Sequence, residues 1–173
     1  MKLKTRNKRK PETNQTMESK LSLPEFRARL RDNTEIGSPK LKLSPFGLFA
    51  GFGGSNPFYG LFDDQSFRLT LNSSVNPTFF IIKGKYKITN EKLLINYDIE
   101  PSTKFYLAWV KFFPISVLIL VNLLFVSSKN INIEAVFVFN IVLIFFIFYS
   151  RWNLKYKRKN IEQKFIEIFE IIK

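Results

Sequence analysis

The chain of 173 residues contains no cysteine and no histidine. Without cysteine there is no disulfide framework, no thiolate nucleophile and no cysteine metal site. Without histidine the chain lacks the commonest general base near neutral pH and the commonest metal ligand. Both absences count against an enzyme, so we expect a non-catalytic protein that needs no cofactor.

Charged residues are almost missing from two long apolar runs, residues 112–126 and 133–149. A helix that spans a bilayer needs roughly 20 mostly apolar residues. The first run reaches that length when residues 106–111 are included, because the side chain of Lys111 is long enough to reach the membrane interface. So uniformly apolar a pair predicts a transmembrane helical hairpin over residues 106–150. A buried helical hairpin of a soluble protein is the alternative.

Polar side chains inside the predicted hairpin are few, and two of them lie at matching depths. Asn122 follows Lys111 by the same number of positions as Asn140 precedes Arg151. At the rise of an α-helix this separation is about 16 Å, close to the centre of a hydrocarbon core about 30 Å thick. An asparagine that faces lipid leaves its amide without partners, so we expect a hydrogen bond between the two helices. Pairing with another subunit is the alternative.

Aromatic and basic residues cluster at one end of the predicted hairpin. Tyrosine and tryptophan are enriched at membrane interfaces, and basic residues are enriched on the cytoplasmic side. The connection between the two runs contains a single basic residue, Lys129, whereas both outer flanks contain more than one. We therefore expect a protein of the bacterial inner membrane with both termini in the cytoplasm. The expected interface anchors are Tyr106, Trp109, Lys111, Tyr149, Arg151 and Trp152.

The net charge of +13 is concentrated at the two ends of the chain. Residues 1–20 contain seven basic and two acidic side chains, and residues 151–173 contain seven and three. Basic segments of this kind favour contact with anionic lipid headgroups. They would also suit nucleic acid, but no known nucleic-acid-binding motif accompanies them. We therefore expect membrane lipid, rather than nucleic acid, as a partner.

The part of the chain before the predicted strands combines a polar arm, a short helix and a loop. Residues 1–20 have too few large apolar groups to fold and are predicted to be a disordered basic arm. Within residues 21–60, Ser22, Pro24 and Glu25 form a helix-start pattern. This short helix either lies on the membrane or packs on the strands that follow. The glycine-, phenylalanine- and proline-rich remainder is predicted to be a loop whose aromatic rings either fold back onto the sheet or enter the interface.

Residues 61–105 are predicted to form a three-stranded antiparallel β-meander. The segments 66–71, 78–88 and 92–99 are rich in β-branched and aromatic residues, and turn residues separate them. In the second segment lysines alternate with apolar residues, which predicts one wet face and one buried face. Gly84 lies on the apolar face and marks a bulge or a close approach. Three strands alone are marginally stable, so the sheet needs cover from the loop, a terminal helix or another subunit.

Residues 151–173 are predicted to form a basic exit from the membrane and a separate amphipathic helix with Asn160 at its N-cap. Apolar residues recur there at helical spacing. We expect this face to dock on the protein's own domain, and docking on a partner is the alternative. The residues of the face are Ile161, Phe165, Ile168 and Ile172.

A pattern of single residues also connects the strands to the first apolar run. It consists of Phe67, Leu69 and Asn72, then Gly84 and Tyr86, then Tyr97, Ile99 and Pro101. With this pattern, the order of parts from residue 61 to residue 173 resembles that of small bacterial membrane proteins of uncharacterised activity. In those proteins a strand pair precedes two membrane helices, and a short amphipathic helix closes the chain. The resemblance implies an architecture and no chemistry.

The predicted fold is therefore an α+β membrane protein with a three-stranded antiparallel β-meander, a transmembrane helical hairpin and a C-terminal amphipathic helix. The expected function is a two-helix anchor that presents a cytoplasmic β module and helix to a protein partner or to other copies of the chain. The alternative is a membrane-acting effector whose hairpins oligomerise to form or gate a pore. An ion pathway generally has more polar lining than Ser116, Asn122 and Asn140 provide, which favours the anchor.

Overall fold

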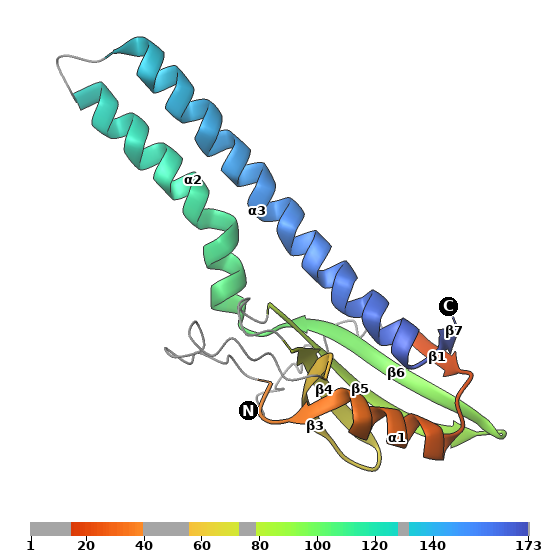
Figure 1. The fold of residues 1–173 in the computed structure, drawn as a ribbon. Helices are drawn as coiled ribbons and strands as arrows, with labels where there is room; N and C mark the ends of the chain where they lie inside the picture. Colours follow the sequence, from red (N-terminus) through yellow and green to blue (C-terminus); the bar gives the residue numbers. More distant parts are fainter. Residues whose placement is uncertain (1–14, 40–55, 73–78, 128–131, 173) are drawn as a thin grey trace, which may run out of the picture.

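The computed structural model describes residues 15–39, 56–72, 79–127 and 132–172. In these residues a mixed sheet lies at one end, and two long helices project away from it as a hairpin (Figure 1). The elements in chain order are β1 (Gln15–Ser19), α1 (Leu23–Asn33), β2 (Thr34–Ile36), β3 (Phe58–Phe62), β4 (Ser66–Leu71), β5 (Phe80–Thr89), β6 (Lys92–Pro101), α2 (Lys104–Ser127), α3 (Ile133–Ile168) and β7 (Ile171–Ile172).

The described strands form one seven-stranded sheet in the order β2-β3-β4-β5-β6-β1-β7. β2 and β3 are parallel, and every other neighbouring pair is antiparallel. The predicted three-stranded meander is therefore wrong as a description of the fold. Its three strands exist as β4, β5 and β6, but they are the middle of a larger mixed sheet.

The additional strands lie where the sequence predicted other structure, and β7 lies in the segment predicted to be the C-terminal helix. β1 occupies the end of the predicted disordered arm and pairs antiparallel with β6, from Gln15 opposite Tyr97 to Ser19 opposite Leu93. β2 and β3 lie in the segment predicted to be helix and loop. β1 and β2 are short, and their partners are distant in the chain, so local patterning does not reveal them. β3 forms a hairpin with the next strand, β4, with Phe62 opposite Phe67. The rest of the arm, residues 1–14, and the loop aromatics Phe46, Phe49 and Phe52 are outside the described residues.

Helix α1 begins with the predicted capping residues and packs on the sheet. The Glu25 carboxylate accepts hydrogen bonds from the Ser22 hydroxyl at 2.6 Å and from the Ser22 N–H at 2.9 Å. These bonds lower the pKa of the Glu25 carboxyl. Phe26 and Leu30, one turn apart on the helix, are both fully buried in the core. Of the two predicted positions of this helix, the structure shows the one on the sheet.

One aromatic core joins α1, the end of α3 and one face of the sheet. Phe26 of α1 lies 4.9 Å from Phe169 between ring centroids, and Phe165 of α3 lies 5.2 Å from Phe67 of β4. Phe58, from the predicted loop, is fully buried against the same two α3-end rings. At least this aromatic residue of the segment folds back onto the sheet. Such rings bury large areas and dominate the energetics of a small core.

The alternation predicted for the central strand is present in β5. Ile82 and Tyr86 are buried on the core side, whereas Lys85 and Lys87 are exposed on the other. Gly84 lies directly opposite Phe67 of β4. A Cβ atom at Gly84 would overlap the end of the Phe67 ring. The glycine therefore marks a close approach of a neighbouring side chain.

Candidate functional site

Helices α2 and α3 are both long and apolar enough to cross a membrane. Their apolar windows are not buried against any part of the described chain. The side chains that surround them are instead large, apolar and exposed, for example Phe137, Phe145 and Phe148 at 64–69% exposure. In water so large an apolar surface would be costly to expose, so the hairpin is the first candidate site of the molecule.

The two asparagines of the hairpin are brought together by the antiparallel packing of α2 and α3. The Asn122 amide nitrogen donates to the Asn140 carbonyl oxygen at 2.7 Å, and the Asn140 amide nitrogen donates to the Asn122 carbonyl oxygen at 3.0 Å. Asn122 also donates to the backbone carbonyl of Leu118 at 2.8 Å. This is the contact that their matching depths predicted, and it is within one chain.

We expect this pair to set the register of the hairpin more than its stability. Hydrogen bonds between membrane helices average about 0.6 kcal/mol in double-mutant cycles and reach about 1.7 kcal/mol. A cycle of Asn122→Leu and Asn140→Leu, measured by unfolding in a lipid-like environment, should give a coupling energy in that range. Each single variant should lose more stability than the double variant, because a single substitution leaves the amide of the other asparagine unpaired. A coupling energy of zero would contradict the contact.

Helix α3 is one uninterrupted helix of 36 residues that extends from the hairpin into the sheet domain. The predicted break after residue 150 and the predicted N-cap at Asn160 are therefore wrong, and Asn160 lies in the interior of the helix. The chain between residues 133 and 168 contains no glycine or proline, and this is the signal that could have predicted continuity. Beyond the hairpin, α3 buries Leu154, Ile161 and Phe165.

The predicted apolar face of the last segment is only partly a helical face. Ile161 and Phe165 are buried in the core, and Ile168 packs against it. The helix ends at Ile168, so Ile172 belongs to β7 and is 45% exposed. Phe169 and Ile171, which the sequence did not single out, are the buried residues at this end. The spacing of the buried residues changes here because the chain switches from helix to strand.

The N-terminal elements hold the end of α3 through its last carbonyl groups. The Ser19 hydroxyl donates to the carbonyl of Phe169 at 2.7 Å, and the Arg29 guanidinium donates to the carbonyl of Ile168 at 2.7 Å. Arg29 also pairs with the Glu170 carboxylate at 2.6 Å. Carbonyls at a helix end need partners, and here β1 and α1 supply them. The helix that carries the hairpin is thus fastened at its far end to the N-terminal part of the described chain.

Aromatic ladders run along both helices at the end of the hairpin next to the sheet. On α2, Trp109 stacks between Phe105 and Phe113, with centroid distances of 6.3 and 4.8 Å. On α3, Trp152 lies between Tyr149 and Tyr156, at 6.1 and 6.0 Å. Both tryptophans are more than half exposed. Of the predicted anchors, Trp109, Tyr149 and Trp152 thus lie in the ladders, and Lys111 and Arg151 are exposed beside them.

Tyr106 lies differently from the other expected anchors. Its ring packs on Phe79 at 5.1 Å, at the junction between the sheet and the hairpin. The ammonium group of Lys157, from α3, lies 4.2 Å from the centroid of the same Phe79 ring. Phe79 therefore joins the start of α2 to α3, and no pattern in the sequence pointed to this role.

The carboxylates of Asp63, Asp64 and Glu100 are engaged in structural contacts. Asp63 accepts from the N–H of Gln65 and of Ser66 at 2.8 and 2.7 Å, which is turn chemistry. Asp64 pairs with Arg27 at 3.2 Å, and Glu100 pairs with Lys83. The described residues contain no group of three acidic side chains that could hold a metal ion.

Tyr97 is the described side chain with the largest shift of its pKa. Burial in the core, and then the neighbouring Glu162 carboxylate, raise the pKa of the Tyr97 hydroxyl to about 12. The Tyr97 ring serves the packing of α3 on β6, where it lies 5.1 Å from the ring of Phe165.

The chain was also compared with known proteins. No protein-family model matches it, and no curated protein or solved structure gives a significant match.

Proposed function

We propose that this protein is a non-catalytic integral membrane protein, in which the α2–α3 hairpin anchors the sheet domain at the membrane surface for binding to a partner protein or subunit. One observation carries the proposal. α3 is a single helix whose first half is apolar and exposed, and whose last turns are the centre of the soluble core. Because one uninterrupted helix connects the hairpin to the core, the sheet would be held at a fixed distance from the bilayer.

The depth of the tryptophans supports the membrane assignment. Trp109 precedes Asn122 on α2, and Trp152 follows Asn140 on α3, by nearly the same number of positions. Along an α-helix these separations are about 20 and about 18 Å. If the asparagine pair marks the bilayer centre, both indole rings fall within the headgroup layer, which lies roughly 15–22 Å from that centre. This is the position that tryptophan prefers.

The basic side chains beside the tryptophans support anionic lipid headgroups as a binding partner. Exposed basic side chains surround the aromatic ladders, and none of the ion pairs among the described residues involves them. Each such charge near an anionic surface contributes about 1 kcal/mol of attraction. The residues are Lys104, Lys111, Arg151, Lys155 and Arg158.

The contacts inside the hairpin support a pore less well than an anchor. In the hairpin Asn122 and Asn140 satisfy each other, so their amides are not available to line an aqueous path. Rapid loss of membrane potential on expression would nevertheless favour the pore over the anchor.

The anchor proposal predicts a topology with the sheet in the cytoplasm and with the C-terminal end of α2 and the N-terminal end of α3 outside. Ser127 and Gln163 are both exposed, one at each end of the hairpin system. Because the chain has no native cysteine, Ser127→Cys and Gln163→Cys give single labelling sites. A membrane-impermeant maleimide should label Ser127→Cys in intact cells and Gln163→Cys only after lysis. The reverse pattern would overturn the topology, and labelling of both in intact cells would overturn the anchor.

A further inference from the structure

Strand β5 extends beyond its neighbour β4 and leaves a notch in the sheet. β5 pairs with β6 along its whole length, to Thr89 opposite Lys92, whereas its pairing with β4 ends at Lys85 opposite Ser66. The last hydrogen bond on this side runs from the Tyr86 N–H to the Gln65 carbonyl at 2.9 Å. Beyond it lies a cavity of about 590 Å³ that is lined by β5, the β3–β4 turn, the start of α1 and residues of β1 and β6.

The main chain of Ile88 faces this notch. In an antiparallel strand the N–H and C=O groups of alternate residues point to the same side. Tyr86 points to the β4 side, so Ile88 does too, and no strand of the described chain pairs with it there. An unpaired strand edge of this kind is a template for an extended peptide.

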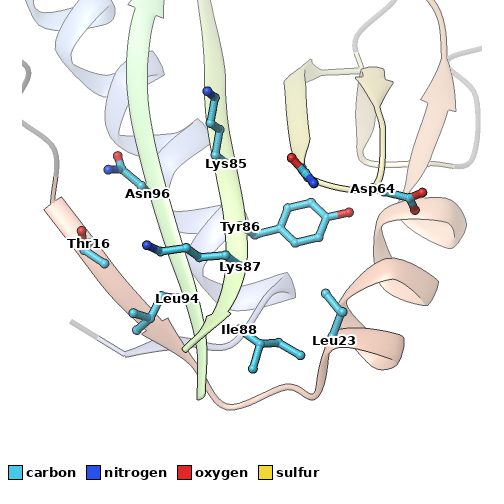
Figure 2. Close-up of a pocket in the computed structure, with 10 residues that line it drawn as sticks. Thr16, Leu23, Asp64, Lys85, Tyr86, Lys87, Ile88, Leu94 and Asn96 are labelled. Carbon is cyan, nitrogen blue, oxygen red and sulfur yellow. The ribbon is translucent and has the colours of Figure 1, made fainter. Parts of the chain in front are cut away.

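The two sides of the notch differ in chemistry. Figure 2 shows Lys87 pointing across β6 and Lys85 lying along β5, whereas Ile88 extends to the opposite side of β5, toward Leu23. Ile88 is 54% exposed, although it continues the apolar face of the strand. Neither lysine belongs to an ion pair of the described chain. Asp64, the carboxylate at the rim, already pairs with Arg27.

We propose that the notch binds a short extended segment of a partner protein in which acidic and apolar residues alternate. The segment continues the line of β4, and its main chain pairs with Ile88. Alternate side chains of a strand point to opposite faces, so its carboxylates meet Lys85 and Lys87 while its apolar side chains cover Ile88 and Leu23. The inference rests on the proposed function, because it assigns the place and chemistry of partner binding on the anchored sheet.

The test uses the whole protein in nanodiscs of phosphatidylcholine, which add no net lipid charge. The probe is a dye-labelled octapeptide that alternates valine and glutamate, and fluorescence anisotropy measures its Kd. We expect saturable binding that the double variant K85Q/K87Q weakens about five- to ten-fold, since two exposed ion pairs are lost and each contributes modestly. The matched control K20Q/K164Q removes two exposed charges elsewhere and should leave the Kd nearly unchanged.

A second variant and a second peptide separate the notch from general attraction to a basic protein. Ile88→Pro removes the N–H that faces the notch, a change that strand edges tolerate, and should also weaken binding. A peptide with four valines followed by four glutamates has the same charge and should bind more weakly. Equal effects of the two double variants, equal binding of the two peptides, or no binding would overturn the proposal. None of these results alters the cysteine labelling, which tests the anchor separately.

Discussion

Replacing Phe165 with alanine is expected to lower the free energy of unfolding of the sheet domain by about 3–5 kcal/mol. The side chain is fully buried, and its ring lies 4.9–6.5 Å from the rings of Phe58, Phe67, Tyr97 and Phe169. Removing it leaves a cavity at the point where α3 meets the sheet. The loss is a large part of the roughly 5–15 kcal/mol that stabilises a typical domain.

Hydrogen exchange of the β5 and β6 amides measures this effect without interference from the hairpin. The matched control is Phe148→Ala, in the same helix, where the side chain is 69% exposed. Protection of the two strands should fall sharply in the Phe165 variant and stay unchanged in the Phe148 variant. Equal protection in both variants would mean that the end of α3 does not stabilise the sheet.

Replacing Gly84 with alanine is expected to cost about 1–3 kcal/mol, although it adds a single methyl group. The new Cβ would overlap the end of the Phe67 ring and lie 2.8 Å from the two adjacent ring carbons. Phe67 is only 1% exposed and packs against Phe165, so its ring has no free space to occupy. One of the two strands or the ring must shift, and the packing around it is lost.

A second substitution tests whether this contact is the cause. Phe67→Leu makes room opposite the glycine, so Gly84→Ala should cost less in the Phe67→Leu background than in the wild type. Lys85→Ala, at the next and exposed position of β5, should change stability by no more than about 0.5 kcal/mol. Thermal unfolding in detergent compares these variants with the wild type. Strictly additive costs of the Gly84 and Phe67 changes would show that the two residues do not clash.

The hairpin and the middle of the sheet follow from the sequence because their signals are local. A long apolar run predicts a helix wherever it lies, and the equal spacing of Asn122 and Asn140 from their basic neighbours predicts their contact. In the same way, the alternation of lysine and apolar residues in β5 predicts which face of the strand is buried. The glycine in that face predicts a bulge or a close approach, and the structure shows a close approach, by Phe67.

Three short strands and the point where α3 ends were decided only by tertiary structure. β1, β2 and β7 are two to five residues long, and their partners lie far away in the chain, so pairing creates them. The basic segment after residue 150 predicts a break, yet α3 continues to Ile168, because no glycine or proline interrupts it and Ile161 and Phe165 are buried in the core of the sheet domain. Local sequence sets where a helix or strand is allowed, and non-local burial decides where it ends.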